Sequence, residues 1–357
     1  MRLVKWIAGS VAALAVLLML AVFVLTTLID ANRFKGRVEQ LVKAGTGQPF
    51  RIEGDLDIAW YPWLSLRMGA ARLGDEPALV QWKSASVGAR LIPLIRGQLE
   101  VSRVRFDGLH ARLVRGADGH GNWEPLIEAR ARSGSSKSSP QVAGFEIRNG
   151  TIEYVDAARP APVLLKDWKL DTGAWESGRP LSVDTSFRLE SGANPTAVPA
   201  ITQASGMLES TEPLRARGKV SIQTASLREL LDQLAVAGPR PRDVQALRRL
   251  SVDAHWTLVD GAFEMKPIAA RIDDTSFTGE LRRPKGAASI LRFELNGDRI
   301  ALDRYVKIEK TSTEPFELPT AGLKGLRVAG VLSFAEAQMG GATARNVRIR
   351  LETDEQT

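Results

Sequence analysis

The chain has 357 residues, of which 44% are hydrophobic and 25% charged, and its formal net charge is +7. It contains no cysteine, which excludes disulfides, zinc–thiolate sites and cysteine nucleophiles. Basic residues are spread along the chain instead of forming a compact patch with interleaved aromatic residues, so we expect no nucleic acid binding. Attraction to anionic lipid head groups and a solvated sheet face are the two remaining interpretations of the positive charge.

The first predicted element is a transmembrane helix at residues 6–29, where 24 positions carry no charge. About 20 apolar residues are enough to cross the hydrocarbon of a bilayer. A cleaved signal peptide is the alternative, but its apolar region usually has only about 7–15 residues. Basic residues flank the run on both sides, so their balance does not decide the orientation. We therefore predict an uncleaved single-pass anchor.

A short amphipathic helix is predicted directly after the anchor. Asp30 or Asn32 can cap it, apolar residues recur at helical spacing as far as Val42, and Gly45 and Gly47 end it. Beyond this helix, short runs alternate apolar and polar residues, which is typical of strands with one apolar face. Asn149-Gly150 lies between two such runs and predicts a β-hairpin turn.

Two segments interrupt the predicted strands. Residues 131–143 are rich in serine and glycine and read as a flexible linker. Residues 226–250 predict a pair of helices, the first capped by Ser226 and the second beginning at Asp243, with a further short helix near 302–306. The expected fold class is mainly β with few helices: an N-terminal transmembrane helix, then a curled antiparallel β groove or sandwich with a helical insert. The expected domains are 1–29, 30–130, the linker 131–143, and 144–357.

Several segments occur in a recognisable order. They are Ile29-Asp30-Ala31-Asn32, Tyr61-Pro62-Trp63-Leu64, Pro93-Leu94-Ile95-Arg96-Gly97, Phe106-Asp107-Gly108, Asp118-Gly119-His120-Gly121-Asn122-Trp123, Leu227-Arg228-Glu229-Leu230-Leu231 and Leu302-Asp303-Arg304-Tyr305. This series resembles the AsmA family of bacterial envelope proteins. The resemblance implies a periplasmic protein held in the inner membrane with its N-terminus in the cytoplasm. It also implies a role in outer-membrane biogenesis, and phospholipid movement along a β groove lined with apolar side chains. Family members usually continue beyond residues 347–351, so this chain reads as a short or truncated member.

The resemblance implies phospholipid as the ligand. Alternating strands can supply the surface for it, because they place apolar side chains on one face and polar ones on the other, and the few predicted helices cannot cover every apolar face. An ordinary sandwich core is the alternative explanation of the same alternation. Envelope assembly proteins are the expected partners of a scaffold or regulator, the alternative function. The candidate groove residues are Leu99, Val101, Phe106, Phe145, Ile147, Val183, Phe187, Leu291, Phe293, Val347 and Ile349.

We predict neither an enzyme nor a bound cofactor or metal. His110, His120 and His255 are far apart in sequence, and no nucleophile elbow or phosphate-binding loop is present. The Asp118–Asn122 segment looks like the start of a calcium loop, but the twelfth position, which needs glutamate, is Ala129. A tight turn is the better interpretation of that segment, and also of Asp273-Asp274.

Overall fold

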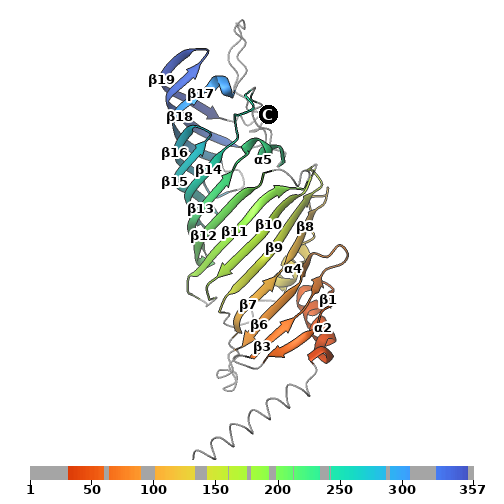
Figure 1. Ribbon diagram of the computed structural model, residues 1–357. Helices are drawn as coiled ribbons and strands as arrows, with labels where there is room; N and C mark the ends of the chain where they lie inside the picture. The colour runs from red at the N-terminus through yellow and green to blue at the C-terminus, as the bar shows by residue number, and fades with distance from the viewer. Residues whose placement is uncertain are drawn as a thin grey trace, which may run out of the picture. The chain divides into compact units, whose positions relative to one another are not determined.

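The computed structural model describes most of the chain (Figure 1). The described residues are 31–59, 64–89, 101–132, 143–159, 161–174, 178–192, 198–211, 213–233, 241, 243–286, 290–305 and 327–352. They form two compact units, the first comprising Met1–Ala111 and Asn122–Glu146, the second Arg112–Gly121 and Ile147–Thr357. The predicted anchor at residues 6–29 lies outside the described residues. Within the described residues, no helix is both long and apolar enough to cross a membrane.

Unit 1 combines short strands with two helices. Its strands pair in two antiparallel groups, β1–β4–β5–β8 and β2–β3–β6–β7. The elements are η1 (Ala31–Phe34), α2 (Lys35–Thr46), β1 (Phe50–Ile52), β2 (Leu56–Ala59), β3 (Leu64–Met68), β4 (Ala71–Leu73), β5 (Val80–Trp82), β6 (Ser84–Ala89), β7 (Val101–Asp107), the first residues of β8 (His110–Arg115), and α4 (Glu124–Arg132).

The core of unit 1 forms between α2 and the first strands. Its buried members are small or branched apolar residues and one phenylalanine: Ala31, Phe50, Ile52, Leu56 and Ala71. The Trp82 ring extends this core, with its centroid 5.7 Å from that of Phe50 and 5.3 Å from that of Phe106. Offset and edge-on rings at this separation attract one another as well as burying apolar area.

The predicted helix after the anchor is present as α2, and Gly47 ends it in a left-handed conformation with φ of 71°. The predicted capping role of Asn32 is wrong. Its side-chain oxygen accepts a hydrogen bond from the backbone N–H of Leu56 at 3.1 Å, and Glu39 accepts one from Ile52 at 2.8 Å. The 3-10 turn η1 and the helix α2 thus each supply an acceptor to a strand N–H group that would otherwise be buried without a partner.

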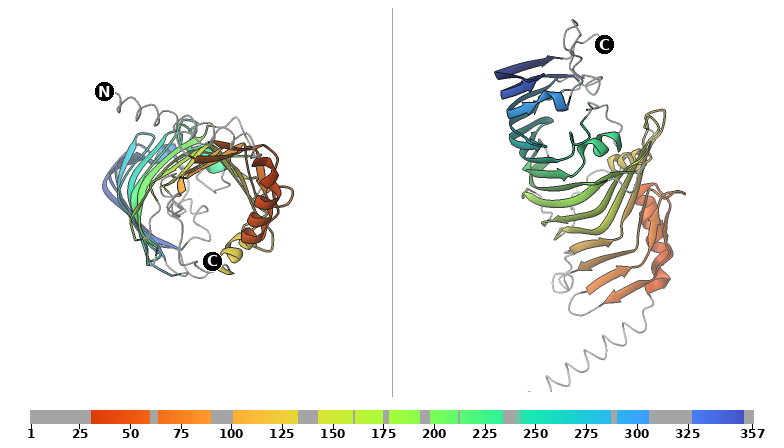
Figure 2. Two further views of the ribbon diagram at one scale, coloured as in Figure 1. Left: turned by 90° about the horizontal axis from the view of Figure 1, so that it is seen from below. Right: turned by 45° about the horizontal axis from the view of Figure 1, so that its top comes forward.

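Unit 2 is one long meander in which consecutive strands are neighbours along a curved sheet (Figure 2). Its strands are β9 (Phe145–Asp156, whose first residues lie in unit 1), β10 (Val163–Thr172), β11 (Leu181–Ser191), β12 (Ala200–Thr211), β13 (Leu214–Thr224), β14 (Leu250–Val259), β15 (Ala262–Ile272), β16 (Thr275–Arg283), β17 (Leu291–Ala301), β18 (Val328–Met339) and β19 (Ala342–Glu352). The expected mainly β fold with few helices is confirmed for the described residues.

One pair of neighbouring strands in unit 2 departs from the predicted antiparallel arrangement. β17 and β18 are parallel, with Leu291 opposite Val328 and Phe293 opposite Gly330. A parallel neighbour needs a crossover of about a dozen residues or more. The chain between Ala301 and Val328 supplies that length. The connection between Thr224 and Leu250, which contains α5, is similarly long but joins the antiparallel strands β13 and β14.

The hairpin predicted at Asn149-Gly150 is wrong, because both residues lie inside β9. Asn149 takes the left-handed conformation with φ of 52°, and Gly150 packs against Trp168, where an added Cβ would lie 3.1 Å from the ring. The pair therefore makes a local irregularity in a continuing strand. The same type of pair, Asp260-Gly261, does make a turn, between β14 and β15.

The helical insert is only half as predicted. The first helix is α5 (Leu227–Gln233), and the Ser226 hydroxyl accepts a hydrogen bond from the Glu229 N–H at its start. The predicted second helix is absent: residues 244–247 form a turn, and Leu247 has a positive φ of 58°. The short helix expected near 302–306 is the single 3-10 turn η2 (Leu302–Arg304).

Replacing Leu56, which is only 2% exposed in the core of unit 1, tests the packing of α2 on the strands. We expect Leu56→Ala to lower the free energy of unfolding by about 2–5 kcal/mol, the usual cost of a cavity in a close-packed core. The control is Leu41→Ala on α2, where the side chain is 68% exposed and the change should be within about 0.5 kcal/mol. Equal midpoints of denaturant unfolding for the two variants would contradict this account of the core.

Candidate functional site

An apolar face runs across nine consecutive strands of unit 2, from β11 to β19. The printed strand registers align three neighbouring rows of residues on it, which we call the apolar face. None of the members is charged, and threonine is the only polar type. The first row is Val183, Gly206, Gly218, Trp256, Met265, Leu281, Phe293, Gly330 and Leu351; the second is Thr185, Ala204, Val220, Ala254, Ile268, Gly279, Leu295, Leu332 and Ile349; the third is Phe187, Thr202, Ile222, Val252, Ala270, Phe277, Gly297, Phe334 and Val347.

The opposite face of the same strands is polar. The row between the second and third apolar rows is Ser186, Gln203, Ser221, Asp253, Ala269, Thr278, Asn296, Ser333 and Arg348. Cross-strand ion pairs lie on this face, among them Arg282 with Glu264 at 2.9 Å and Arg217 with Glu209 at 2.7 Å. Because successive side chains of a strand point to opposite faces, the sheet has one solvated side and one apolar side.

The side chains of the apolar face are mostly only half-buried. Every member of the first row is neither buried nor fully exposed, and the fully buried members of the other two rows are few: Ala254, Ile268, Thr202, Gly297 and Phe334. The cluster of buried apolar residues described above lies in unit 1. The apolar face therefore has free area toward which no described element packs closely enough to bury it.

Glycines flatten parts of the apolar face beneath aromatic rings. A Cβ added to Gly218 would lie 2.8 Å from Cζ2 of Trp256, and one added to Gly330 would lie 2.6 Å from the ring of Phe293. Phe334 covers Gly297 in the same way and meets Phe277 edge-on at 5.9 Å. Glycine leaves room for rings that lie this close to the backbone, because the Cβ of any other residue would collide with them.

The candidate groove residues fall into three groups. Six lie together on the apolar face: Val183, Phe187, Leu291, Phe293, Val347 and Ile349. Leu291 is not in the three rows, but it lies on the same side of β17 as Phe293, two residues earlier. Ile147 is buried on β9, Phe145 is 36% exposed at its start, and Phe106 packs on Trp82 in unit 1. Leu99 lies outside the described residues, and only the strand position of Val101 is described.

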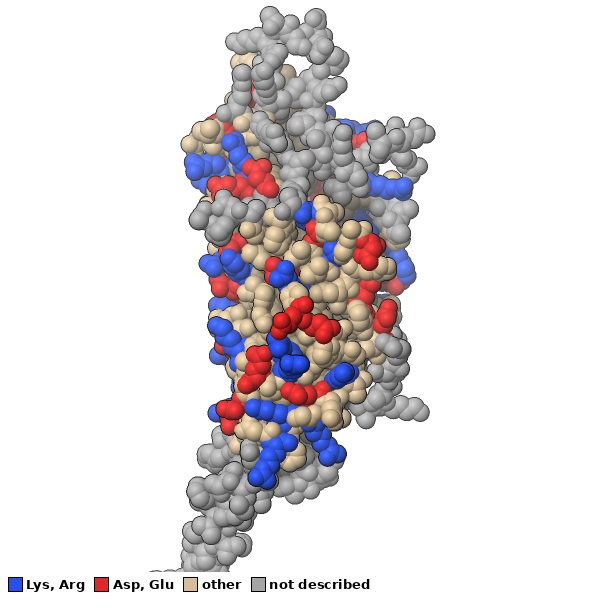
Figure 3. All heavy atoms as spheres, turned by 90° about the vertical axis from the view of Figure 1, so that its right-hand side faces the viewer, with Lys and Arg blue, Asp and Glu red and all other residues tan. Residues whose placement is uncertain are grey.

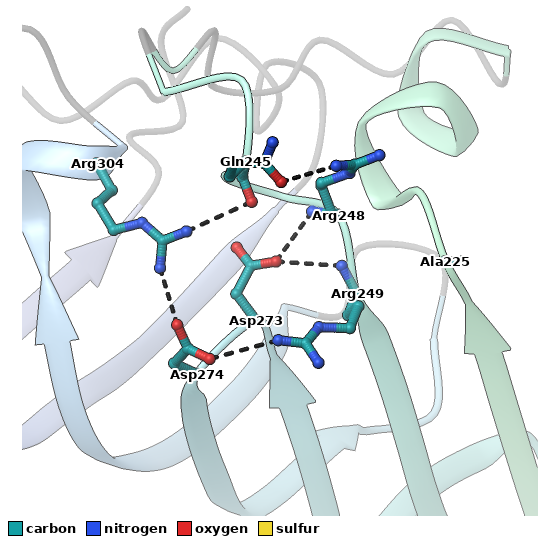
Figure 4. A pocket seen from close by; sticks show the side chains of 7 residues that line it. All are labelled: Ala225, Gln245, Arg248, Arg249, Asp273, Asp274 and Arg304. Atoms are coloured by element: carbon teal, nitrogen blue, oxygen red, sulfur yellow. Dashed lines mark hydrogen bonds and ion pairs between the residues drawn. The ribbon is translucent and has the colours of Figure 1, made fainter.

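A polar pocket borders the apolar face at one end of the strands (Figure 4). It has a volume of about 360 Å³ and is lined by Ala225, Gln245, Arg248, Arg249, Asp273, Asp274 and Arg304. On the apolar face, the row of residues next to the pocket is Thr224, Leu250, Ile272 and Thr275. The next residue along each of these strands lines the pocket, which therefore lies at the ends of strands that carry the apolar face.

Asp273 organises the pocket. It sits in the β15–β16 turn with φ of 51° and is 3% exposed. Its carboxylate accepts backbone N–H bonds from Leu247 at 2.7 Å, Arg248 at 2.9 Å and Arg249 at 3.1 Å, and the Tyr305 hydroxyl donates to it at 3.0 Å. These donors explain why residues 244–247 make a turn instead of a helix, because Asp273 takes the N–H groups that a helix would use internally.

The same contacts set the acidity of both partners. Burial raises the pKa of Asp273, but the hydrogen bonds from the Arg249, Leu247 and Arg248 backbone and from Tyr305 outweigh it, so the pKa is lowered. Burial, followed by the hydrogen bond to Asp273, raises the pKa of Tyr305 to about 12. Asp273 is therefore ionised and Tyr305 neutral at physiological pH.

Arg304 connects the segment after β17 to the pocket. It pairs with Asp243 at 2.8 Å and with Asp274 at 3.0 Å. Arg249 meets Asp274 at the longer distance of 3.5 Å, and both of those side chains are about 70% exposed. Arg248 donates to the neutral amide oxygen of Gln245 at 2.7 Å. Asp243 and Asp274 are thus paired mainly with Arg304. Arg248 and Arg249 have weaker interactions, with a neutral amide and at a longer, exposed distance.

The described residues offer no arrangement typical of catalysis. No group of three or more potential metal ligands occurs among them. His110 contacts Gln81 at 3.2 Å, and the Asp118 carboxylate accepts the His120 N–H within a tight turn. On the face drawn in Figure 3, lysine and arginine lie intermixed with aspartate and glutamate. Such mixed charge offers no single-sign stripe of the kind that nucleic acid binding requires.

Sequence reasoning identified the alternation of the strands but missed the pocket. Asp273-Asp274 was interpreted only as a turn, which is correct, because the chain does reverse there between β15 and β16. The function of Asp273 within the turn depends on residues 247–249, which lie about 25 positions earlier. An aspartate-rich turn beside an arginine pair, Arg248-Arg249, is the only local signal, and it does not reveal that contact.

The described part of unit 2 is thus an extended β-sheet with one apolar side and one polar side. Residues 2–174, just under half of the chain, match the AsmA family model, in agreement with the resemblance seen in the sequence. The chain is also 26% identical over 160 residues to the AsmA family protein YhjG of Escherichia coli (strain K12), a match that covers 40% of this chain and 23% of that protein. No solved structure matches the chain. The whole apolar face, which begins on β11, lies beyond the matched residues.

Replacing Asp273 tests whether it holds the pocket together. We expect Asp273→Asn to lower the free energy of unfolding by about 1.5–3 kcal/mol, because an amide cannot accept all of the hydrogen bonds that the carboxylate accepts. The neighbouring Asp274→Asn is the control, since its exposed ion pairs should contribute about 0–1 kcal/mol. Thermal unfolding that is equally affected by the two changes would show that Asp273 has no special role.

The stability difference between wild type and Asp273→Asn should depend on pH. The pKa of Asp273 is lower in the folded protein than in the unfolded chain, where it is about 3.9. Its contribution is therefore complete above about pH 4 and is lost as the pH falls through the lowered folded value. Unfolding midpoints measured from pH 7 down to pH 2 should converge for the two proteins at the acid end. A constant difference over that range would contradict the assignment.

Proposed function

We propose that this chain binds the acyl chains of phospholipid on the apolar face of unit 2 and thereby serves lipid supply or organisation in the bacterial envelope. The observation that carries the proposal is the set of three uncharged rows across nine strands, whose side chains are half-buried rather than packed away. The family match to residues 2–174 supports the envelope setting. The chain spans 23% of the length of the curated relative, so the role of the whole protein is part of the proposal.

The energetics of a phospholipid explain why such a face is useful. Each buried CH₂ is worth about 0.8 kcal/mol, so some 30 methylenes hold a lipid in its bilayer with roughly 25 kcal/mol. A protein that accepts the lipid must replace most of that apolar contact, otherwise the lipid does not leave. Large half-exposed side chains such as Trp256, Met265, Phe293 and Leu332 supply this contact on the apolar face.

The dimensions of the face fit acyl chains. Nine strands at about 4.8 Å spacing extend roughly 38 Å across the sheet. One leaflet of a bilayer, which an acyl chain fills, is about 15 Å thick. The face is therefore long enough for a lipid to lie across several strands. It is too short by itself to bridge two membranes, which favours binding or a share in a longer path.

Paired positions on the two faces of β16 and β17 allow a direct test in cells. Leu281 lies opposite Phe293 on the apolar face, and Thr278 lies opposite Asn296 on the polar face. A photoreactive phenylalanine analogue at Leu281 or Phe293 should form adducts with radiolabelled phospholipid. The same analogue at Thr278 or Asn296 should form few. Adducts with proteins alone at the apolar positions would instead support a scaffold that binds other envelope proteins.

A charge placed on the apolar face should remove the lipid without unfolding the sheet. We expect Leu332→Asp to reduce phospholipid adducts at Phe293 strongly, because an ionised carboxylate beside acyl chains loses its hydration. Ser333→Asp, the next residue on β18 and on the polar face, is the matched control and should leave the adducts unchanged. Thermal unfolding of both variants reports whether they are folded. Undiminished adducts in a folded Leu332→Asp protein would refute lipid binding on this face.

A further inference from the structure

The pocket beside the apolar face has the chemistry of a phosphate site. Three arginines reach it, Arg248, Arg249 and Arg304, together with the carboxylates of Asp273 and Asp274. Asp273 is saturated by three backbone N–H groups and the Tyr305 hydroxyl. Asp274 accepts from Arg304 at 3.0 Å. Asp273 stays ionised, but its oxygens are occupied by donors inside the protein, and Arg304 is shared by Asp243 and Asp274. Arg248 and Arg249 are the guanidinium groups whose present partners are a neutral amide and a long, exposed ion pair.

Arg248 and Arg249 can exchange their present partners for a ligand. The Arg248 guanidinium donates to the neutral oxygen of Gln245, and the Arg249–Asp274 pair is long and exposed. An exposed pair of this kind contributes about 0–1 kcal/mol, so its loss is a small cost. Arginine offers two parallel N–H donors that match two oxygens of a phosphate, and such charged bonds are about twice as strong as neutral ones.

The position of the pocket adds the second requirement. The apolar face ends beside the pocket at Thr224, Leu250 and Ile272. Each of these is followed or preceded directly by a residue of the pocket lining: Ala225, Arg249 and Asp273. A strand rises about 3.3 Å per residue, so along these strands the ends of the apolar rows and the lining of the pocket are a single residue apart. A molecule with a phosphate at one end and long apolar chains at the other would match a charged pocket beside an apolar face.

We propose that Arg248 and Arg249 bind the phosphate of a glycerophospholipid whose acyl chains lie on the apolar face. This inference rests on the proposed function and assigns the head-group end of the same site. Arg304 is a positioning residue: by pairing with Asp243 and Asp274 it holds the turn at 243–249 against the β15–β16 turn. Asp273 holds the backbone of Arg248 and Arg249 from the other side.

The test compares two lipids that differ only in the phosphate. Full-length protein in maltoside micelles is photolabelled with phosphatidylglycerol or with diacylglycerol, each with the same diazirine-bearing acyl chains. Phosphatidylglycerol carries no ammonium group, so the comparison isolates the phosphate. At equal subsaturating concentrations we expect about tenfold more labelling of the wild type by phosphatidylglycerol, the ratio that about 1.4 kcal/mol of charged hydrogen bonding gives.

The double variant Arg248→Gln/Arg249→Gln should lose this preference and keep its labelling by diacylglycerol. The backbone N–H groups that Asp273 binds remain in this variant, so the pocket stays in place. Arg215→Gln/Arg217→Gln removes two arginines at exposed positions on the polar side of β13 and is the charge-matched control. It should keep the tenfold preference, because a loss there would show that net charge alone attracts the lipid.

The outcomes separate this inference from the proposed function. If neither lipid labels the wild type, lipid binding itself fails. If both lipids label the wild type and the double variant equally, the apolar face binds lipid and the phosphate assignment is overturned. Inorganic phosphate, titrated calorimetrically without lipid at constant ionic strength, forms a separate arm. Binding there to wild type and not to the double variant, without a preference for phosphatidylglycerol in the labelling, would assign the pocket to free phosphate and overturn the head-group assignment.

Discussion

The alternation of side-chain direction along a β-strand is the constraint on which the structure of unit 2 depends. A shift of one residue in any strand would carry its apolar side chains to the solvated side. The registers from β11 to β19 avoid this even where bulges interrupt them, as between Ala254 and Trp256 on β14. The parallel pairing of β17 with β18 also keeps Phe293 and Gly330 in one row. A single apolar face therefore persists through changes of strand direction and local irregularities.

This face has an energetic consequence. In unit 1 the apolar side chains of the short strands are buried by α2 and by one another, around Phe50 and Leu56. In unit 2 the described residues provide α5 and a turn near one end, and the rings of Trp256, Phe293 and Phe334 lie over glycines. The sheet is stabilised through its ladders and cross-strand pairs, while much of one side keeps apolar area available to a ligand. The two units therefore handle the same kind of strand pattern in opposite ways.

The pocket is a cluster of polar contacts at the border of the apolar face, and it is held together by the hydrogen bonds of Asp273. A buried carboxylate is costly unless its hydrogen bonds are satisfied, and Asp273 has four donors. Its contacts join the turn before β14, the β15–β16 turn and Tyr305 into one structure. The guanidinium groups that remain near the opening then act as a cationic edge to an uncharged surface.

The sequence by itself determined the class of fold, the positions of several strands and the resemblance to a family, because alternation, turn residues and motif order are local signals. It also placed Val183, Phe187, Phe293, Val347 and Ile349 on apolar faces, since period two is visible along each strand. Only the tertiary structure decided that those faces are one face, because register between strands is a property of pairing and not of any single segment. The same reason explains the errors: Asn149-Gly150 continues a strand through packing on Trp168, and residues 244–247 form a turn because Asp273, far along the chain, takes the backbone donors.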